Sequence, residues 1–142
     1  MALILCVETS SKNCSVALSK DGIVTYTREK CEEGYCHGEK LHSLIEDLFI
    51  DAKIEISQID AISFSCGPGS YTGLRIGAAT VKGLGISLNK KIVLISTLQA
   101  MCWGFVNHKQ ENFISDANYF CSTLDSRLGE VYAAIYDILG NE

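Results

Sequence analysis

The sequence predicts an α/β fold in which helices flank a mixed sheet, in the order β-β-β-α-β-α-β-α followed by a hairpin. Two observations support this class. The chain opens with three consecutive strand patterns, and it then alternates helical patterns with short apolar runs typical of buried strands. The opening therefore predicts antiparallel strands, and the later alternation predicts a parallel portion with helices packed on it.

The three opening strands differ in pattern. Leu3–Val7 is continuously apolar, as expected of a central strand that is buried on both faces. A polar turn follows, and Cys14–Ser19 alternates apolar and polar residues as a half-covered strand does. The dipeptide Asp21-Gly22 is a hairpin signal, so Ile23–Arg28 is predicted to be the returning strand.

Helical periodicity begins after residue 40. One face of a first helix would hold the apolar residues Leu41, Leu44, Ile45, Leu48 and Phe49. A strand is predicted at Ala61–Cys66, and the break at Gly67-Pro68-Gly69 leads to a second helix from about Thr72 to Leu88. Ile92–Ile95 is predicted to be another buried strand. A capping-box pattern starting at Ser96 then opens a third helix, whose apolar face would hold Leu98, Met101, Cys102 and Phe105.

The carboxy-terminal residues return to a strand pattern. They predict a hairpin of roughly Tyr119–Leu124 and Val131–Ile138, with no helix after it. We therefore expect the chain to end inside a larger protein, just after a second domain begins. The expected boundaries are residues 1–112 for the first domain and 113–142 for the opening hairpin of a second, truncated one.

Composition limits the classes of function. The chain is 47% hydrophobic and 20% charged, which indicates a packed core and excludes global disorder. Its net charge of −5 and its scattered Lys and Arg residues argue against unaided binding of nucleic acid. The seven cysteines include no Cys-x-x-Cys pair, and no apolar run approaches the ~20 residues that span a bilayer. We expect a cytoplasmic protein with reduced cysteines and no membrane contact.

The glycine-rich turn before the second helix has two interpretations. Backbone N–H groups at such a turn, together with the helix dipole, form an anion site; a plain strand-to-helix turn has the same composition. The turn matches neither a P-loop nor a dinucleotide fingerprint. A possible nucleotide or anion site would comprise Glu8, Thr9, Ser10, Gly67 and Gly69.

The second helix carries small residues at every fourth position: Gly73, Gly77, Val81 and Gly85. Each glycine costs a helix about 1 kcal/mol relative to alanine. Their repetition predicts the close approach of another backbone, and in so small a domain we favour a partner protein. Arg75 lies in the first turn, where the dipole disfavours a cation, so an anionic group such as a partner carboxylate is expected beside it.

Four ordered motifs together resemble the TsaB (YeaZ-like) family from end to end. They are the strand followed by Glu8-Thr9-Ser10, the segment from Gly67-Pro68-Gly69-Ser70-Tyr71-Thr72 to Gly77, Ser96-Thr97-Leu98, and Asp125-Ser126-Arg127 running on to Tyr132. Many members of that family have Asp where this chain has Glu8. A catalytic paralogue, TsaD, shares the first two motifs but carries metal-binding histidines after the third buried strand. Residues 98–104 contain no histidine here, which favours the scaffold paralogue.

The resemblance implies a fold of the actin, hsp70 and sugar-kinase type, built of ribonuclease-H-like domains within the glycoprotease-like superfamily. It implies a non-catalytic subunit for the threonylcarbamoyladenosine modification of tRNA. Its partners would be a TsaD-type catalytic subunit and a TsaE-type ATPase, with a homodimer in their absence and tRNA bound only through the complex. ATP and a metal would belong to the partner subunits, and no cofactor, metal or catalytic residue is expected in this chain.

The helical face that such proteins use for partners maps onto residues of the first two helices. The predicted interface consists of Leu41, Leu44, Ile45, Leu48, Tyr71, Gly73, Leu74, Arg75, Gly77, Ala78, Val81 and Gly85. Two alternatives remain open. An actin-like protein would bind or hydrolyse ATP at Glu8, Thr9 and the turn of Gly67–Gly69. A glycoprotease-like metallopeptidase would need a metal site that the sequence does not indicate.

Overall fold

The computed structural model describes residues 2–31, 37–108, 119–127, 129–137 and 141, and it confirms the α/β class. Five strands form one sheet in the order β3-β2-β1-β4-β5, and two form a separate hairpin sheet. In chain order the strands are β1 (Leu3–Glu8), β2 (Asn13–Lys20), β3 (Ile23–Cys31), β4 (Ala61–Ser65), β5 (Lys91–Ile95), β6 (Tyr119–Asp125) and β7 (Val131–Asp137). As predicted, β1, β2 and β3 are antiparallel, and β4 and β5 are parallel to β1.

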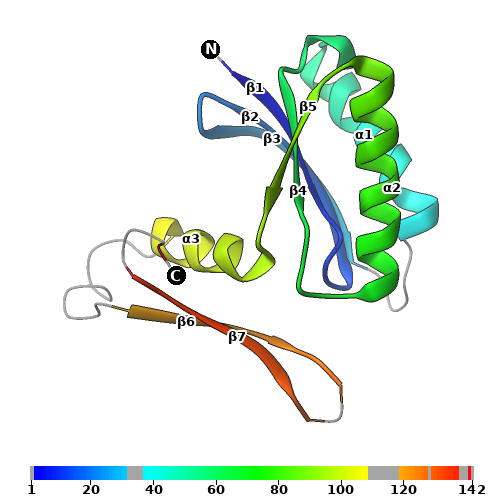
Figure 1. Ribbon diagram of the computed structural model, residues 1–142. Coiled ribbons are helices and arrows are strands. Elements are labelled where there is room, and N and C mark those ends of the chain that lie inside the picture. The colour runs from blue at the N-terminus through cyan, green and yellow to red at the C-terminus, as the bar shows by residue number, and fades with distance from the viewer. Residues whose placement is uncertain (1, 32–36, 109–118, 128, 138–140, 142) are drawn as a thin grey trace.

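Helices α1 (His37–Ala52) and α2 (Tyr71–Leu88) pack together on one face of the five-stranded sheet, whereas α3 (Thr97–His108) lies with the hairpin at one end of it (Figure 1). A short 3-10 helix, Ile56–Gln58, follows α1 and was not predicted. Among the described residues, no helix is long and apolar enough to cross a membrane.

The main core lies between the sheet and the pair α1 and α2. It is built of alternate strand residues and of one face of each helix: Leu5, Val7, Cys14, Val16, Leu18, Leu41, Leu44, Ile45, Leu48, Phe49, Ile59, Ile62, Phe64 and Val81. The prediction that β1 is buried on both faces is wrong for the face that points away from α1 and α2. Ile4 and Cys6 are only half-buried there, because α1 and α2 both cover the other side.

Strand β5 departs further from its prediction as a buried strand. It is the last strand of the sheet, and the side chains of Ile92, Val93 and Leu94 are 36%, 45% and 65% exposed. A short apolar run has the same sequence pattern in a central strand and in an edge strand. Its position in the sheet could not be read from the pattern.

The third helix shares a second, smaller core with the hairpin. Leu98 and Cys102 of α3 pack with Tyr136 of β7, and the rings of Phe105 and Phe120 lie 5.9 Å apart. The predicted apolar face of α3 is thus only partly buried, since Met101 and Phe105 are exposed. The domain boundary predicted at residues 112 and 113, and the end of the hairpin at Ile138, lie outside the described residues.

A candidate protein-binding groove and an adjoining polar cavity

The turn between β4 and α2 is fixed against the end of β1. Ser70 N donates to the carbonyl oxygen of Ser10 at 2.6 Å, and a Cβ atom on Gly69 would overlap that same carbonyl. Gly67 has a φ of +117°, in the region that favours glycine. Ser70 then caps α2, because its Oγ accepts a hydrogen bond from Gly73 N at 3.2 Å. The start of α2 is therefore held in one position above the carboxyl ends of β1 and β4.

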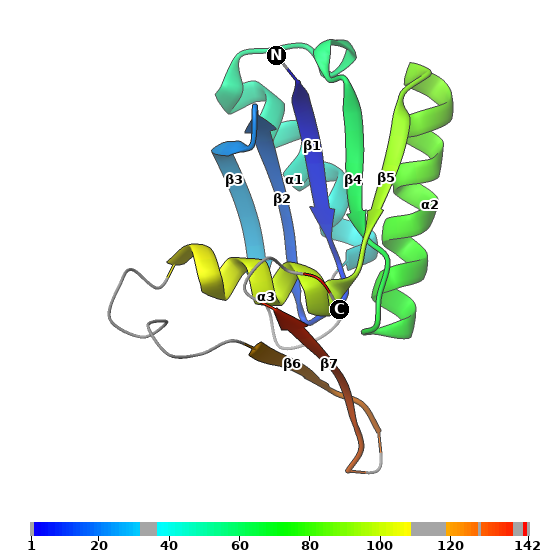
Figure 2. The same cartoon turned by 60° about the vertical axis from the view of Figure 1, so that its left-hand side comes forward.

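An open groove of about 810 Å³ lies between α2 and β5. Figure 2 shows the two elements side by side at the edge of the sheet. The apolar lining comes from β4, from the turn, from one side of α2 and from β5: Phe64, Cys66, Pro68, Leu74, Ala78, Val81, Ile92 and Leu94. Leu94 is mostly exposed, so the groove presents apolar surface that the described chain does not cover.

Two cations stand at the rim of this groove. Arg75 and Lys82 are both exposed residues of α2, and among the described residues that line the groove no carboxylate accompanies them. The guanidinium of Arg75 lies 4.1 Å from the centre of the Tyr71 ring, a cation–π arrangement. Arg75 is the fifth residue of α2, and the group found beside its guanidinium is an aromatic ring, whereas the sequence predicts an anionic group there.

A polar cavity of about 760 Å³ adjoins the groove on the other side of Tyr71. It is lined by the end of β1, the start of α2 and the hairpin: Ser10, Ser11, Lys12, Gly69, Ser70, Tyr71, Thr72, Leu124, Asp125, Ser126, Arg127 and Tyr132. Tyr132 of β7 also lines the groove. Among the described lining residues, the cations Lys12 and Arg127 and the N-terminus of α2 face a single carboxylate, that of Asp125. This balance suits an anion.

Eight of the twelve predicted interface residues are buried inside this chain's own fold, and their contact with a partner stays a prediction. They are Leu41, Leu44, Ile45, Leu48, Gly73, Gly77, Val81 and Gly85. The glycines do make close contacts, but the nearest atoms at Gly77 and Gly85 belong to side chains of the chain's own fold. A Cβ atom on Gly77 would lie 2.5 Å from Phe64 Cε2, and one on Gly85 would lie 2.9 Å from Ile92 Cδ1.

The remaining four residues, Tyr71, Leu74, Arg75 and Ala78, all line the groove. The prediction missed Lys82, Leu94 and Tyr132. Lys82 follows Arg75 by seven residues, two helical turns, and this spacing was a visible signal. Nothing in the sequence indicated that Leu94 is uncovered or that Tyr132 of the hairpin reaches the groove.

The five residues predicted for an anion site are separated by the structure. Ser10 lines the polar cavity, Gly67 lines the groove, and Gly69 lines both. Glu8 accepts a hydrogen bond from Ser10 N at 2.6 Å, so its carboxylate supports the turn. Thr9 is fully buried under α2, and its hydroxyl has no hydrogen-bond partner among the described residues. Within the residues that the structure describes, no group of three His, Cys, Asp or Glu side chains could hold a metal ion.

Comparison with known proteins shows the family to which this chain belongs. Residues 33–142 match the family described as TsaD: tRNA N6-adenosine threonylcarbamoyltransferase. Among curated relatives, the tRNA threonylcarbamoyladenosine biosynthesis protein TsaB of Haemophilus influenzae is 32% identical over 91% of this chain and 51% of its own length. The Escherichia coli TsaB protein is likewise 32% identical, over 94% of this chain and 54% of its own length.

The solved structures agree with the sequence relatives. YeaZ from Pseudomonas aeruginosa superposes with a TM-score of 0.84 at 29% identity, covering 96% of this chain and 61% of that protein. The fold is thus the mixed-sheet, helix-flanked fold of the YeaZ proteins. The chain belongs to the glycoprotease-like family of TsaD, and its resemblance to TsaB is confirmed. It spans about half the length of the curated relatives that it matches.

Proposed function

We propose that this chain is a non-catalytic scaffold subunit in the biosynthesis of threonylcarbamoyladenosine in tRNA, and that it binds a TsaD-type catalytic subunit. The observation that carries the proposal is the open apolar groove beside α2, where the four surface-accessible residues of the predicted interface meet. Contiguous uncovered apolar surface of this kind is typical of protein-binding sites. The curated relatives from Haemophilus influenzae and Escherichia coli are TsaB proteins, and they suggest the pathway.

The other partners follow from the same proposal. A TsaE-type ATPase joins the complex, and tRNA is bound through the partner subunits because this chain carries a net charge of −5. ATP and a metal ion belong to those subunits, and the chain acts in the cytoplasm. Without its partners the chain forms a homodimer.

Size-exclusion chromatography with light scattering tests the proposal, on the chain alone and mixed with the TsaD-type protein of the same organism. The expected result is a homodimer that converts to a one-to-one heterodimer. A TsaD-type protein that elutes unchanged beside this chain at tens of micromolar would contradict the proposal. The polar-cavity variant Lys12→Ala serves as a matched control, because it lies outside the groove and should still form the heterodimer.

A second candidate function rests on the polar cavity. Lys12, Arg127 and the N-terminus of α2 form an electropositive site that suits a nucleotide phosphate. We propose it as the location for an actin-like nucleotide site. Calorimetry with ATP and Mg²⁺ should show binding that Arg127→Ala weakens, and the absence of any heat of binding would exclude this function for the 142-residue chain.

A further inference from the structure

Glu8 is the last residue of β1, and its carboxylate binds the turn that follows the strand. Its Oε1 atom accepts a hydrogen bond from Ser10 N at 2.6 Å. Because Ser10 is only 4% exposed, its amide is shielded from water and needs a hydrogen-bond partner within the fold. A hydrogen bond from an amide to a carboxylate is shorter and stronger than one to a neutral group. Glu8 therefore fixes the direction of the chain where it leaves β1.

Ser10 passes this constraint on to the start of α2. Its carbonyl oxygen accepts a hydrogen bond from Ser70 N at 2.6 Å. The two segments are so close that a Cβ atom on Gly69 would lie 2.6 Å from Ser10 Cβ. Ser70 Oγ in turn accepts a hydrogen bond from Gly73 N. Three consecutive hydrogen bonds thus join the Glu8 carboxylate to the first turn of α2.

Glu8 supports the polar cavity but does not line it. The residues that its hydrogen bonds reach, or that directly follow them, do line the cavity: Ser10, Ser11, Lys12, Gly69 and Ser70. Glu8 is not among the described residues of that lining. It lines a separate pocket of about 280 Å³ together with Cys6. Since Leu5 and Val7 of β1 point into the main core, the alternation of a strand directs Glu8 to the sheet face away from α1 and α2.

We propose that Glu8 is a positioning residue and not a ligand of a metal ion. Through the backbone of Ser10 and Ser70, its carboxylate holds the start of α2 against the end of β1 and so sets one wall of the polar cavity. The sequence grouped Glu8 with the residues of a possible anion site, and the hydrogen bonds give it a different role there. This inference goes beyond the proposed function, because it requires neither a partner protein nor a nucleotide.

Amide hydrogen exchange in three variants tests the positioning role. Glu8→Ala removes the acceptor, so the protection factors of the Ser10 and Ser70 amides should fall about tenfold or more. Glu8→Gln keeps an acceptor oxygen at the same distance along the side chain without the charge. Glu8→Asp keeps a carboxylate that reaches the amide two residues on, as Asp commonly does in turns. Both conservative variants should retain most of the protection, because the position depends on the acceptor.

Two controls separate a local effect from a general loss of stability. The amide of Asp60 donates to the carbonyl oxygen of Leu3 at 2.7 Å, at the opposite end of β1, and its protection should change little in Glu8→Ala. Glu46→Ala removes an exposed carboxylate from α1 and should leave the protection of the Ser10 amide unchanged.

Two results with these variants would overturn the inference. If the Ser10 and Ser70 amides of Glu8→Ala stay fully protected, the carboxylate does not hold the turn. If the amide of Asp60 loses as much protection as they do, the substitution acts on the whole fold and not on the start of α2.

A titration of the unmodified chain with Mg²⁺ alone does not depend on whether any variant folds. The nuclear magnetic resonance signal of the Glu8 carboxyl carbon should keep its position at millimolar Mg²⁺, and the Ser10 amide should stay protected. Mg²⁺ binds carboxylate oxygens directly, so a metal ion at Glu8 would shift that carbon signal. A saturable shift of the Glu8 signal would overturn the inference, because Glu8 would then be a metal ligand.

Discussion

Gly77 of α2 packs directly on Thr9 at the end of β1, so that a Cβ atom on Gly77 would overlap Thr9 Oγ1. Phe64 of β4 closes the other side of this contact at 2.5 Å from the same position. The small residue is therefore required by the approach of α2 to its own sheet. Gly77 and Gly85 of α2 pack within the fold, and the groove lies beside them on the same helix.

Gly77→Ala is expected to destabilise the chain. Alanine gains about 1 kcal/mol in helix propensity, but overpacking a tight contact costs typically 1–3 kcal/mol, and both atoms opposite Gly77 belong to well-anchored elements. We expect a net loss of about 1 kcal/mol or more in the free energy of unfolding, measured by urea denaturation.

Gly83→Ala is the matched control on the same helix. Its Cβ atom would meet nothing within 4 Å, so only the propensity term remains and the variant should gain about 0.5–1 kcal/mol. Equal effects of the two substitutions would contradict the packing role of Gly77. This result also bears on interface mapping, since a bulky residue at Gly77 would weaken partner binding through the fold and not through a lost contact.

Ser70→Ala is expected to loosen the start of α2. Loss of the Ser70 Oγ to Gly73 N hydrogen bond removes an N-cap, which typically costs about 1 kcal/mol. Because Tyr71 lies in the first turn and Arg75 directly follows that turn, the variant should bind the TsaD-type protein more weakly in addition to being less stable. Ser70→Asp restores an N-cap acceptor and should recover most of the stability; if Ser70→Ala melts at the unmodified temperature, the cap contributes nothing.

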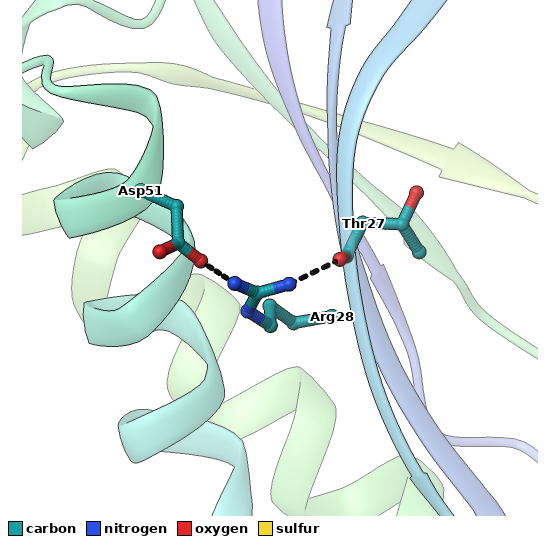
Figure 3. Close-up of polar contacts among 3 residues, drawn as sticks. All are labelled: Thr27, Arg28 and Asp51. Atoms are coloured by element: carbon teal, nitrogen blue, oxygen red, sulfur yellow. Dashed lines mark hydrogen bonds and ion pairs between the residues drawn. The ribbon is translucent and has the colours of Figure 1, made fainter.

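The ion pair between Arg28 and Asp51 joins β3 to α1 (Figure 3). Arg28 Nη1 also donates to the carbonyl oxygen of Thr27 at 3.4 Å. The two side chains are 47% and 38% exposed, so solvent screens the pair. Asp51→Asn should lower the free energy of unfolding by only about 0.2–1 kcal/mol, and 1 M NaCl should remove the difference. A larger loss that persists at high salt would mean that the pair anchors the strand.

The sequence was sufficient for the order and type of the elements, because each depended on local periodicity and turn chemistry. It predicted the apolar helical face of Leu41 to Phe49, which packs in the chain's own core. The spacing could not show this, because a face that packs on the chain's own sheet and one that packs on another protein have the same spacing. The groove could not be predicted for a related reason. It forms where Leu94, Arg75 and Tyr132 meet, and these residues belong to three elements brought together by the tertiary fold.

Cys102 links the stability of the α3–hairpin core to pH. Burial raises the pKa of its thiol above the ordinary value of 9.0, and the negative charge of Asp137 adds to the rise. The folded state therefore holds the proton more tightly than the unfolded state does. The free energy of unfolding should fall as pH rises above about 9, by at most about 1.4 kcal/mol per pH unit from this group.

Urea denaturation at a series of pH values from about 8 to 11 measures this effect. Cys102→Ala loses packing at every pH, so its stability curve should lie lower, but it should decline less steeply above pH ~9 than that of the unmodified chain. Cys121→Ala, at an exposed position on β6, controls for the removal of a thiol. Parallel curves for the unmodified chain and Cys102→Ala would show that the Cys102 thiol has the same affinity for its proton in both states, and that Asp137 does not act on it.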